Sequence, residues 1–98
     1  MRDPEILAEV KATLALLTQR SPGRAIEVRI PPYAAVQCGA GPTHTRGTPA
    51  NVIEMDASTW LALASGERSW AEAMASGAIN ASGVRADLTE LLPLRMEL

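Results

Sequence analysis

The stretch AIEVRIPPYAAVQC, residues 25–38, decides the fold of this 98-residue chain. In its first part, residues 25–30, isoleucine and valine alternate with glutamate and arginine. This period of two predicts a strand with one buried face and one polar face. The double proline at 31–32 ends that strand, and residues 33–38 predict a second one directly after it. Two strands this close along the chain are expected to lie side by side as a hairpin.

Outward from this pair, a third strand is predicted at residues 51–55 and a short fourth strand at residues 78–82. A first helix is expected to begin at Asp3-Pro4-Glu5 and to end before Ser21-Pro22-Gly23. The remaining expected helices are residues 59–66, 69–77 and 85–92, the second of which has a capping box of Ser69 and Glu72. The sequence therefore predicts one α+β domain, residues 1–98, with a mostly antiparallel β-sheet covered on one face by helices.

Composition limits the classes of function. The net charge is −2, so nothing in the charge balance favours a nucleic-acid partner. One cysteine cannot form an internal disulfide, and no apolar run approaches the ~20 residues of a membrane span. We expect a cytoplasmic protein. Aromatic residues make up only 3% of the chain, so aliphatic side chains must build most of the core.

The loop CGAGPTHTRGTP, residues 38–49, holds the single cysteine and the single histidine. Its glycines lack the spacing and the lysine of a phosphate loop, and Cys38 with His44 supplies two of the three or four ligands that zinc needs. Cys38 at a strand end is expected to be a small buried hydrophobe, so we predict no catalytic residue, no metal site and no cofactor. His44 and Arg46 are candidates for a polar mouth or partner contact. Alternatively, Arg46 pairs with Glu54 or Asp56 and fixes the entry to the third strand.

The second half of the chain resembles the sterol carrier protein type 2 family. Domains of that family close with an acidic residue, two short helices that each lead to a glycine, a strand that ends in glycine, and a leucine-rich helix. The matching residues here are Asp56, Leu61, Leu63, Gly66, Ala73, Met74, Gly77, Ile79, Gly83, Leu88, Leu91 and Leu92. Residues 44–54 are similar to a stretch typical of the short actinobacterial proteins called bacterial sterol carrier orthologues.

The resemblance implies a non-enzymatic domain that binds a lipid-like or other apolar small ligand between sheet and helices. We predict that seven residues line that cavity: Trp60, Leu63, Trp70, Met74, Ile79, Leu88 and Leu91. The alternative is an accessory interaction module whose core is filled and holds no ligand. The amphipathic first helix packs on its own domain or serves a homodimer or another protein partner, and the sequence leaves this choice open.

Overall fold

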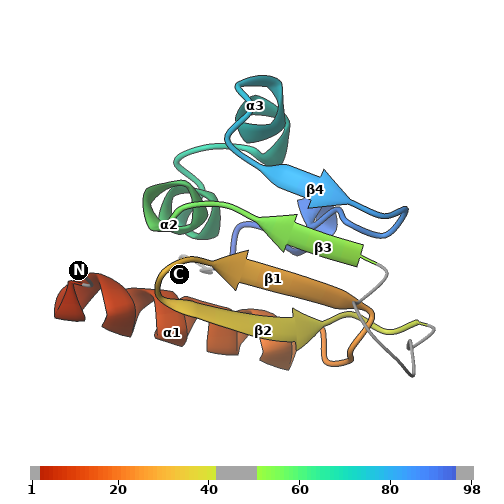
Figure 1. Cartoon of the computed structure of the whole chain (residues 1–98), viewed down its shortest axis with the longest axis horizontal. Helices are drawn as coiled ribbons and strands as arrows, with labels where there is room; N and C mark the ends of the chain where they lie inside the picture. The colour runs from red at the N-terminus through yellow and green to blue at the C-terminus, as the bar shows by residue number, and fades with distance from the viewer. Residues whose placement is uncertain (1–2, 42–50, 95–98) are drawn as a thin grey trace.

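The computed structural model describes residues 3–41 and 51–94 of the chain, and Figure 1 shows their arrangement. Within these described residues, three α-helices and four strands follow one another, and a short 3-10 turn comes last. In order, the elements are α1 (Pro4–Arg20), β1 (Ile26–Ile30), β2 (Ala34–Cys38), β3 (Asn51–Glu54), α2 (Ala57–Ser65), α3 (Trp70–Ala75), β4 (Asn80–Ser82) and η1 (Thr89–Leu91).

The four strands form one mixed sheet in the order β2-β1-β3-β4. The pairs β1–β2 and β3–β4 are antiparallel, whereas β1 and β3 run parallel. The predicted α+β class is therefore confirmed, and two of the three pairings are antiparallel. In the hairpin, Val28 lies opposite Val36 and Ile26 opposite Cys38. The alternation read from residues 25–30 thus sets the register, because a slip by one residue would turn the apolar side chains to the wrong face.

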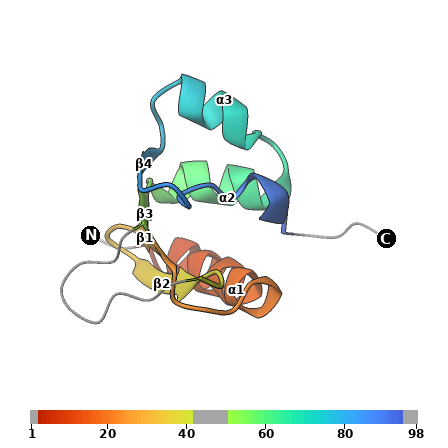
Figure 2. The same cartoon turned by 90° about the vertical axis from the view of Figure 1, so that its right-hand side faces the viewer.

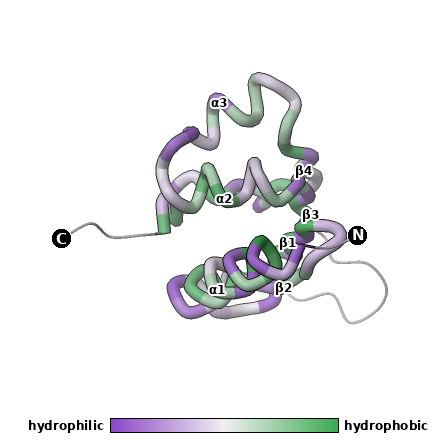
Figure 3. Tube along the Cα trace, turned by 90° about the vertical axis from the view of Figure 1, so that its left-hand side faces the viewer, coloured by the Kyte–Doolittle hydropathy of each residue, from purple (hydrophilic) through white to green (hydrophobic). Residues whose placement is uncertain are grey.

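The helices lie on one face of the sheet, as predicted (Figure 2). α1 contacts β2 and α2, and α3 lies beyond the β4 end of the sheet (Figures 1 and 2). The uncovered face carries Glu27 and Arg29, whose side chains form an ion pair with 2.7 Å between Arg29 Nε and Glu27 Oε2. Hydrophobic residues are interspersed with hydrophilic ones along the helices and strands (Figure 3). The half-polar pattern of β1 is explained by this single covered face.

The helix ends use the residues that the sequence predicted for two of the three helices. Asp3 caps α1 by accepting from the N–H groups of Glu5 and Ile6. The capping box of α3 is complete, because Ser69 Oγ accepts from the N–H of Glu72 and the Glu72 carboxylate accepts from the N–H of Ser69. The predicted start of α2 at residue 59 is wrong. That helix begins at Ala57, and Asp56 is its cap.

The space between sheet and helices is filled by side chains in the part of the chain that the structure describes. Trp60, Val28 and Leu88 are all 0% exposed, and Leu63 is 1% exposed. The indole N–H of Trp60 donates to Thr13 Oγ1 on α1 at 2.7 Å, so the largest buried side chain is also satisfied as a hydrogen-bond donor.

The predicted last helix, residues 85–92, is wrong. Its place is taken by the single turn η1 and the extended residues after it. We call residues 88–94, with η1 included, the C-terminal strap. Asp87 precedes this turn, and its carboxylate accepts from the N–H of Thr89 at 2.8 Å, a local side-chain to backbone contact. An extended strap also lets Leu88 and Leu94 both bury their side chains.

Within residues 3–41 and 51–94, no helix is long and apolar enough to cross a lipid bilayer.

Candidate functional site

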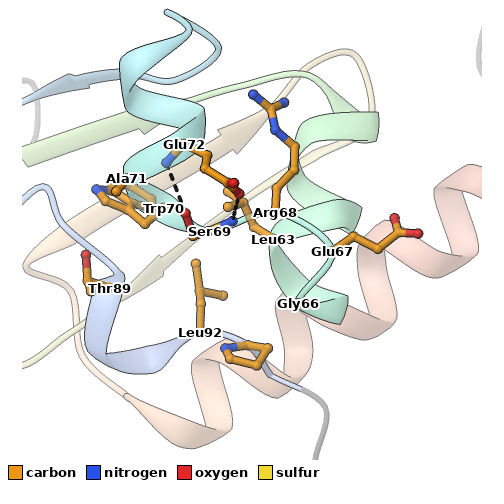
Figure 4. Close-up of a pocket in the computed structure, with 11 residues that line it drawn as sticks. Leu63, Gly66, Glu67, Arg68, Ser69, Trp70, Ala71, Glu72, Thr89 and Leu92 are labelled. Carbon is orange, nitrogen blue, oxygen red and sulfur yellow. Dashed lines mark hydrogen bonds between the residues drawn. The ribbon is translucent and has the colours of Figure 1, made fainter.

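A pocket of about 410 Å³ lies where the connection between α2 and α3 faces the C-terminal strap (Figure 4). We call it the α2–α3 pocket. It is apolar inside and polar at its rim, as ligand sites commonly are. Its apolar lining is Leu63, Gly66, Trp70, Ala71, Leu92 and Pro93, and its polar lining is Glu67, Arg68, Ser69, Glu72 and Thr89.

The rim of this pocket is held by the start of α3. The capping box fixes Ser69 and Glu72, and the two hydrogen bonds between them are drawn in Figure 4. The backbone N–H of Ser69 is the main reason that the pKa of Glu72 lies below its ordinary value, and Arg68 adds a smaller attraction. The Arg68 guanidinium extends away from Leu92 and donates to Ser76 Oγ at 2.7 Å. The Glu72 carboxylate at the rim is therefore kept ionised. The nearby Arg68 guanidinium uses one of its hydrogen bonds on Ser76, directly after α3.

Gly66 positions the apolar end of the pocket. It follows α2 in a left-handed conformation, with φ of 90°, and its N–H is bonded to the carbonyls of Ala62 and Leu63. A Cβ at this position would lie 3.5 Å from Cβ of Pro93, so the strap passes directly over the glycine. The left-handed backbone is what favours glycine at this helix stop, and the strap closes one side of the pocket beside it.

A second pocket, of about 600 Å³, lies on the other side of the strap, and we call it the β1-side pocket. It is more polar than the first, with hydroxyl, carboxylate and guanidinium groups around an apolar floor. Its lining is Ser21, Ile26, Gly39, Ala40, Arg85, Asp87, Thr89, Glu90 and Leu91. The two pockets share Thr89, so the strap is the wall between them.

The seven residues predicted to line a cavity are distributed between these two pockets, the core and the surface of α3. Leu63 and Trp70 line the α2–α3 pocket, and Leu91 lines the β1-side pocket. Trp60, Ile79 and Leu88 are packed in the core and line neither of these pockets. Met74 is 42% exposed on α3 and also lines neither. A single cavity shared by all seven residues stays a prediction.

The predicted polar mouth, His44 and Arg46, lies outside the described residues. Cys38, from the same loop, is 0% exposed at the end of β2. Burial raises the pKa of the Cys38 thiol, so the thiolate needed for nucleophilic chemistry is disfavoured. Among residues 3–41 and 51–94, no three histidine, cysteine, aspartate or glutamate side chains gather in a way that could hold a metal ion.

Two residues that the sequence reading did not single out hold this region together. Asn51 is buried, donating to the carbonyl of Ala25 and accepting from the N–H of Arg85, both at 2.9 Å. It thereby joins β1, β3 and the chain leading to the strap. In the sequence, the signal for this role is an asparagine at the start of a predicted strand, because an amide that becomes buried there requires hydrogen-bond partners.

The other is Arg20, at the end of α1. Its guanidinium donates to three backbone carbonyls of the strap, at 3.0 Å to Leu91, 2.9 Å to Pro93 and 2.9 Å to Leu94. In the sequence this arginine looks like an ordinary basic residue in the last turn of a helix, and nothing in its spacing indicates partners more than 70 residues away.

The described residues form a small α+β domain with a mixed sheet covered on one face by helices. Comparison with protein families matches residues 3–94 to the family described as bacterial SCP ortholog, so the chain belongs to that family. This match covers nearly the whole described structure and confirms the resemblance read from residues 56–94. The comparison with curated proteins found no match.

Proposed function

We propose that this protein is a non-enzymatic, cytoplasmic carrier-type domain that binds a small apolar or amphipathic molecule in the α2–α3 pocket. The observation that carries the proposal is the pocket itself, an apolar floor of Leu63, Trp70, Leu92 and Pro93 beneath a polar rim. Its volume of about 410 Å³ falls within the usual range of small-molecule sites. Membership in a carrier-type family supports this choice of function over the other uses of a surface pocket.

The proposed site differs from the one inferred from the sequence. A ligand between the sheet and the helices would have to displace Trp60 or Leu88, both of which are fully buried. A ligand in the α2–α3 pocket displaces no core side chain. It would lie against the indole of Trp70, which offers a wide apolar surface at small entropic cost.

The test is a titration with a dansyl-labelled fatty acid, with two matched phenylalanine variants on α3. Ala71 lines the α2–α3 pocket, whereas Ala75, one turn further along the same helix, is exposed and does not. Ala71→Phe fills the pocket and is expected to weaken binding of the probe at least about tenfold, because the apolar contact area is lost. Ala75→Phe is expected to leave the dissociation constant unchanged.

Equal effects of the two variants would reject the α2–α3 pocket as the site. Absence of saturable binding in the wild-type protein, together with a native mass spectrum without any co-purified ligand, would reject the carrier function. That result would favour the second candidate, an interaction module with a filled core. The filled space around Trp60 and the fully exposed Val84, between β4 and the strap, are the observations in its favour.

A further inference from the structure

The C-terminal strap separates two pockets of different polarity. On one side, Leu92 and Pro93 face the apolar α2–α3 pocket. On the other side, Glu90 and Leu91 face the β1-side pocket, which also contains the guanidinium of Arg85. Thr89 lines both spaces. A movement of this one segment would therefore join an apolar space to a more polar one.

The strap is anchored at both ends, at the first by a buried side chain and at the last by a buried side chain and a backbone hydrogen bond. Leu88 is 0% exposed and fixes the start. At the far end, Leu94 is 3% exposed and its N–H donates to the carbonyl of Ala64 at 2.9 Å. The residues between these two, 89–93, are exposed or half-buried. A segment with few buried contacts between two fixed ends opens at lower cost than the core around it.

Arg20 supplies three further hydrogen bonds, all of them to backbone carbonyls of the strap. Its three hydrogen bonds reach carbonyls at residues 91, 93 and 94, so one side chain holds the second half of the strap. Arg20 is exposed, and water can replace it as a donor to each carbonyl. The closed position thus depends on Arg20 at the end of α1 as well as on the buried side chain of Leu94.

We propose that the C-terminal strap is a gate, and that the release of residues 91–94 from Arg20 joins the two pockets into one channel. This proposal deepens the proposed function and rests on it for the identity of the occupant. The occupant is an elongated amphipathic molecule. Its apolar part lies against Leu63 and Trp70, and its polar end lies among the charged groups of Arg85 and Glu90.

The test compares Arg20→Met with Arg24→Met. Methionine keeps the aliphatic length and removes the three hydrogen bonds. Arg24 is a matched control because its guanidinium donates to Gln37 Oε1, away from the strap. Hydrogen exchange of the Leu94 amide is expected to be at least about tenfold faster in Arg20→Met, since bonds from a charged donor are lost, and unchanged in Arg24→Met. Equal Leu94 exchange in Arg20→Met and wild type would overturn the gate.

Access to the pocket is tested without a ligand. Leu63→Cys in a Cys38→Ala background places a thiol on the floor of the α2–α3 pocket, where the leucine is 1% exposed. Maleimide labelling of this thiol is expected to be about tenfold faster when Arg20→Met is added, because labelling follows strap opening. An unchanged labelling rate would show that the strap does not control entry.

Binding kinetics then separate the gate from the proposed function. With dansyl-labelled fatty acid, Arg20→Met is expected to raise the association and dissociation rates together, with a smaller change in their ratio. A protein whose strap opens by exchange and labelling but which binds no probe contradicts the proposed function and leaves the gate standing. Unchanged probe rates in a strap-released protein would show that the probe enters elsewhere and would overturn the gate.

Discussion

Thr13 is the residue on which the largest core side chain depends. Its hydroxyl accepts from the Trp60 indole N–H and donates to the carbonyls of Glu9 and Val10 within α1. Thr13→Val keeps the shape and leaves the indole donor buried without a partner, which costs about 1–3 kcal/mol of unfolding free energy. Thr13→Ser keeps the hydroxyl and is expected to cost less. Urea denaturation followed by tryptophan fluorescence measures both, and equal losses for the two variants would contradict this role.

Asn51, at the start of β3, is a second buried polar residue that holds other groups in place through hydrogen bonds. Asn51→Ala leaves the carbonyl of Ala25 and the N–H of Arg85 without their partners, and we expect a loss of about 1–3 kcal/mol in unfolding free energy. Asn80→Ala on β4 is the control, since Asn80 is exposed and its substitution should change stability by less than about 0.5 kcal/mol. Thermal and urea unfolding of the two variants give the comparison. Similar stabilities for both alanine variants would contradict the joining role of Asn51.

At the scale of elements, the start of α2 depends on the ionised carboxylate of Asp56. The backbone N–H of Thr59 is the main reason that the pKa of Asp56 lies below its ordinary value. A lowered pKa in the folded state means that the stabilisation is complete above the unfolded-state value, about 4, and is lost as the pH falls through the folded-state value. Asp56→Ala is therefore expected to cost about 1 kcal/mol at pH 7 and progressively less below pH 4.

Asp56→Asn is the matched control for this pH dependence. Asparagine remains a good helix cap and does not titrate, so its stability relative to Asp56→Ala should stay constant with pH. Unfolding free energies from urea denaturation between pH 7 and pH 3 provide the test. If the difference between wild type and Asp56→Ala also stays constant over that range, the carboxylate charge is not what stabilises α2.

Elements were predictable where local chemistry decides them. The alternation in β1 and the capping box at Ser69 specify a strand and a helix within a few residues, and the structure has both. The final helix was predicted wrongly because its leucine spacing fits a helix as well as a strap. What decides between the two is partly non-local: the carbonyls of the strap are satisfied by Arg20, a partner that no local pattern reveals.

The candidate site shows the same limit. Leu63 and Trp70 were predicted as ligand contacts and do line a pocket, because both lie at the junction of α2 and α3. The opposite wall, Leu92 and Pro93, was not predicted, since it exists only where the strap passes over Gly66. Trp60 was assigned to the cavity because the resemblance implies a ligand between the sheet and the helices. Its hydrogen bond to Thr13 instead fixes it in the core.

At the scale of the whole molecule, Cys38 reports on global opening. Its side chain is 0% exposed and burial raises its pKa, so a thiol reagent reaches it only when the domain opens. For a small domain with ordinary stability, we expect labelling of the native protein to be at least ~10³-fold slower than labelling in urea. Mass spectrometry after timed exposure to a maleimide measures both rates.

The labelling rate of Cys38 also provides a test of the stabilising role of Thr13. If Cys38 is labelled through global unfolding, Thr13→Val should speed native-state labelling in proportion to its loss of stability, about 5- to 150-fold for 1–3 kcal/mol. Thr13→Ser should speed it less, in the same order as the urea measurements. Arg20→Met releases only the strap and should change Cys38 labelling far less than it changes Leu94 exchange. Fast labelling of Cys38 in Arg20→Met, with little loss of global stability, would show that strap opening also exposes the β2 end of the core.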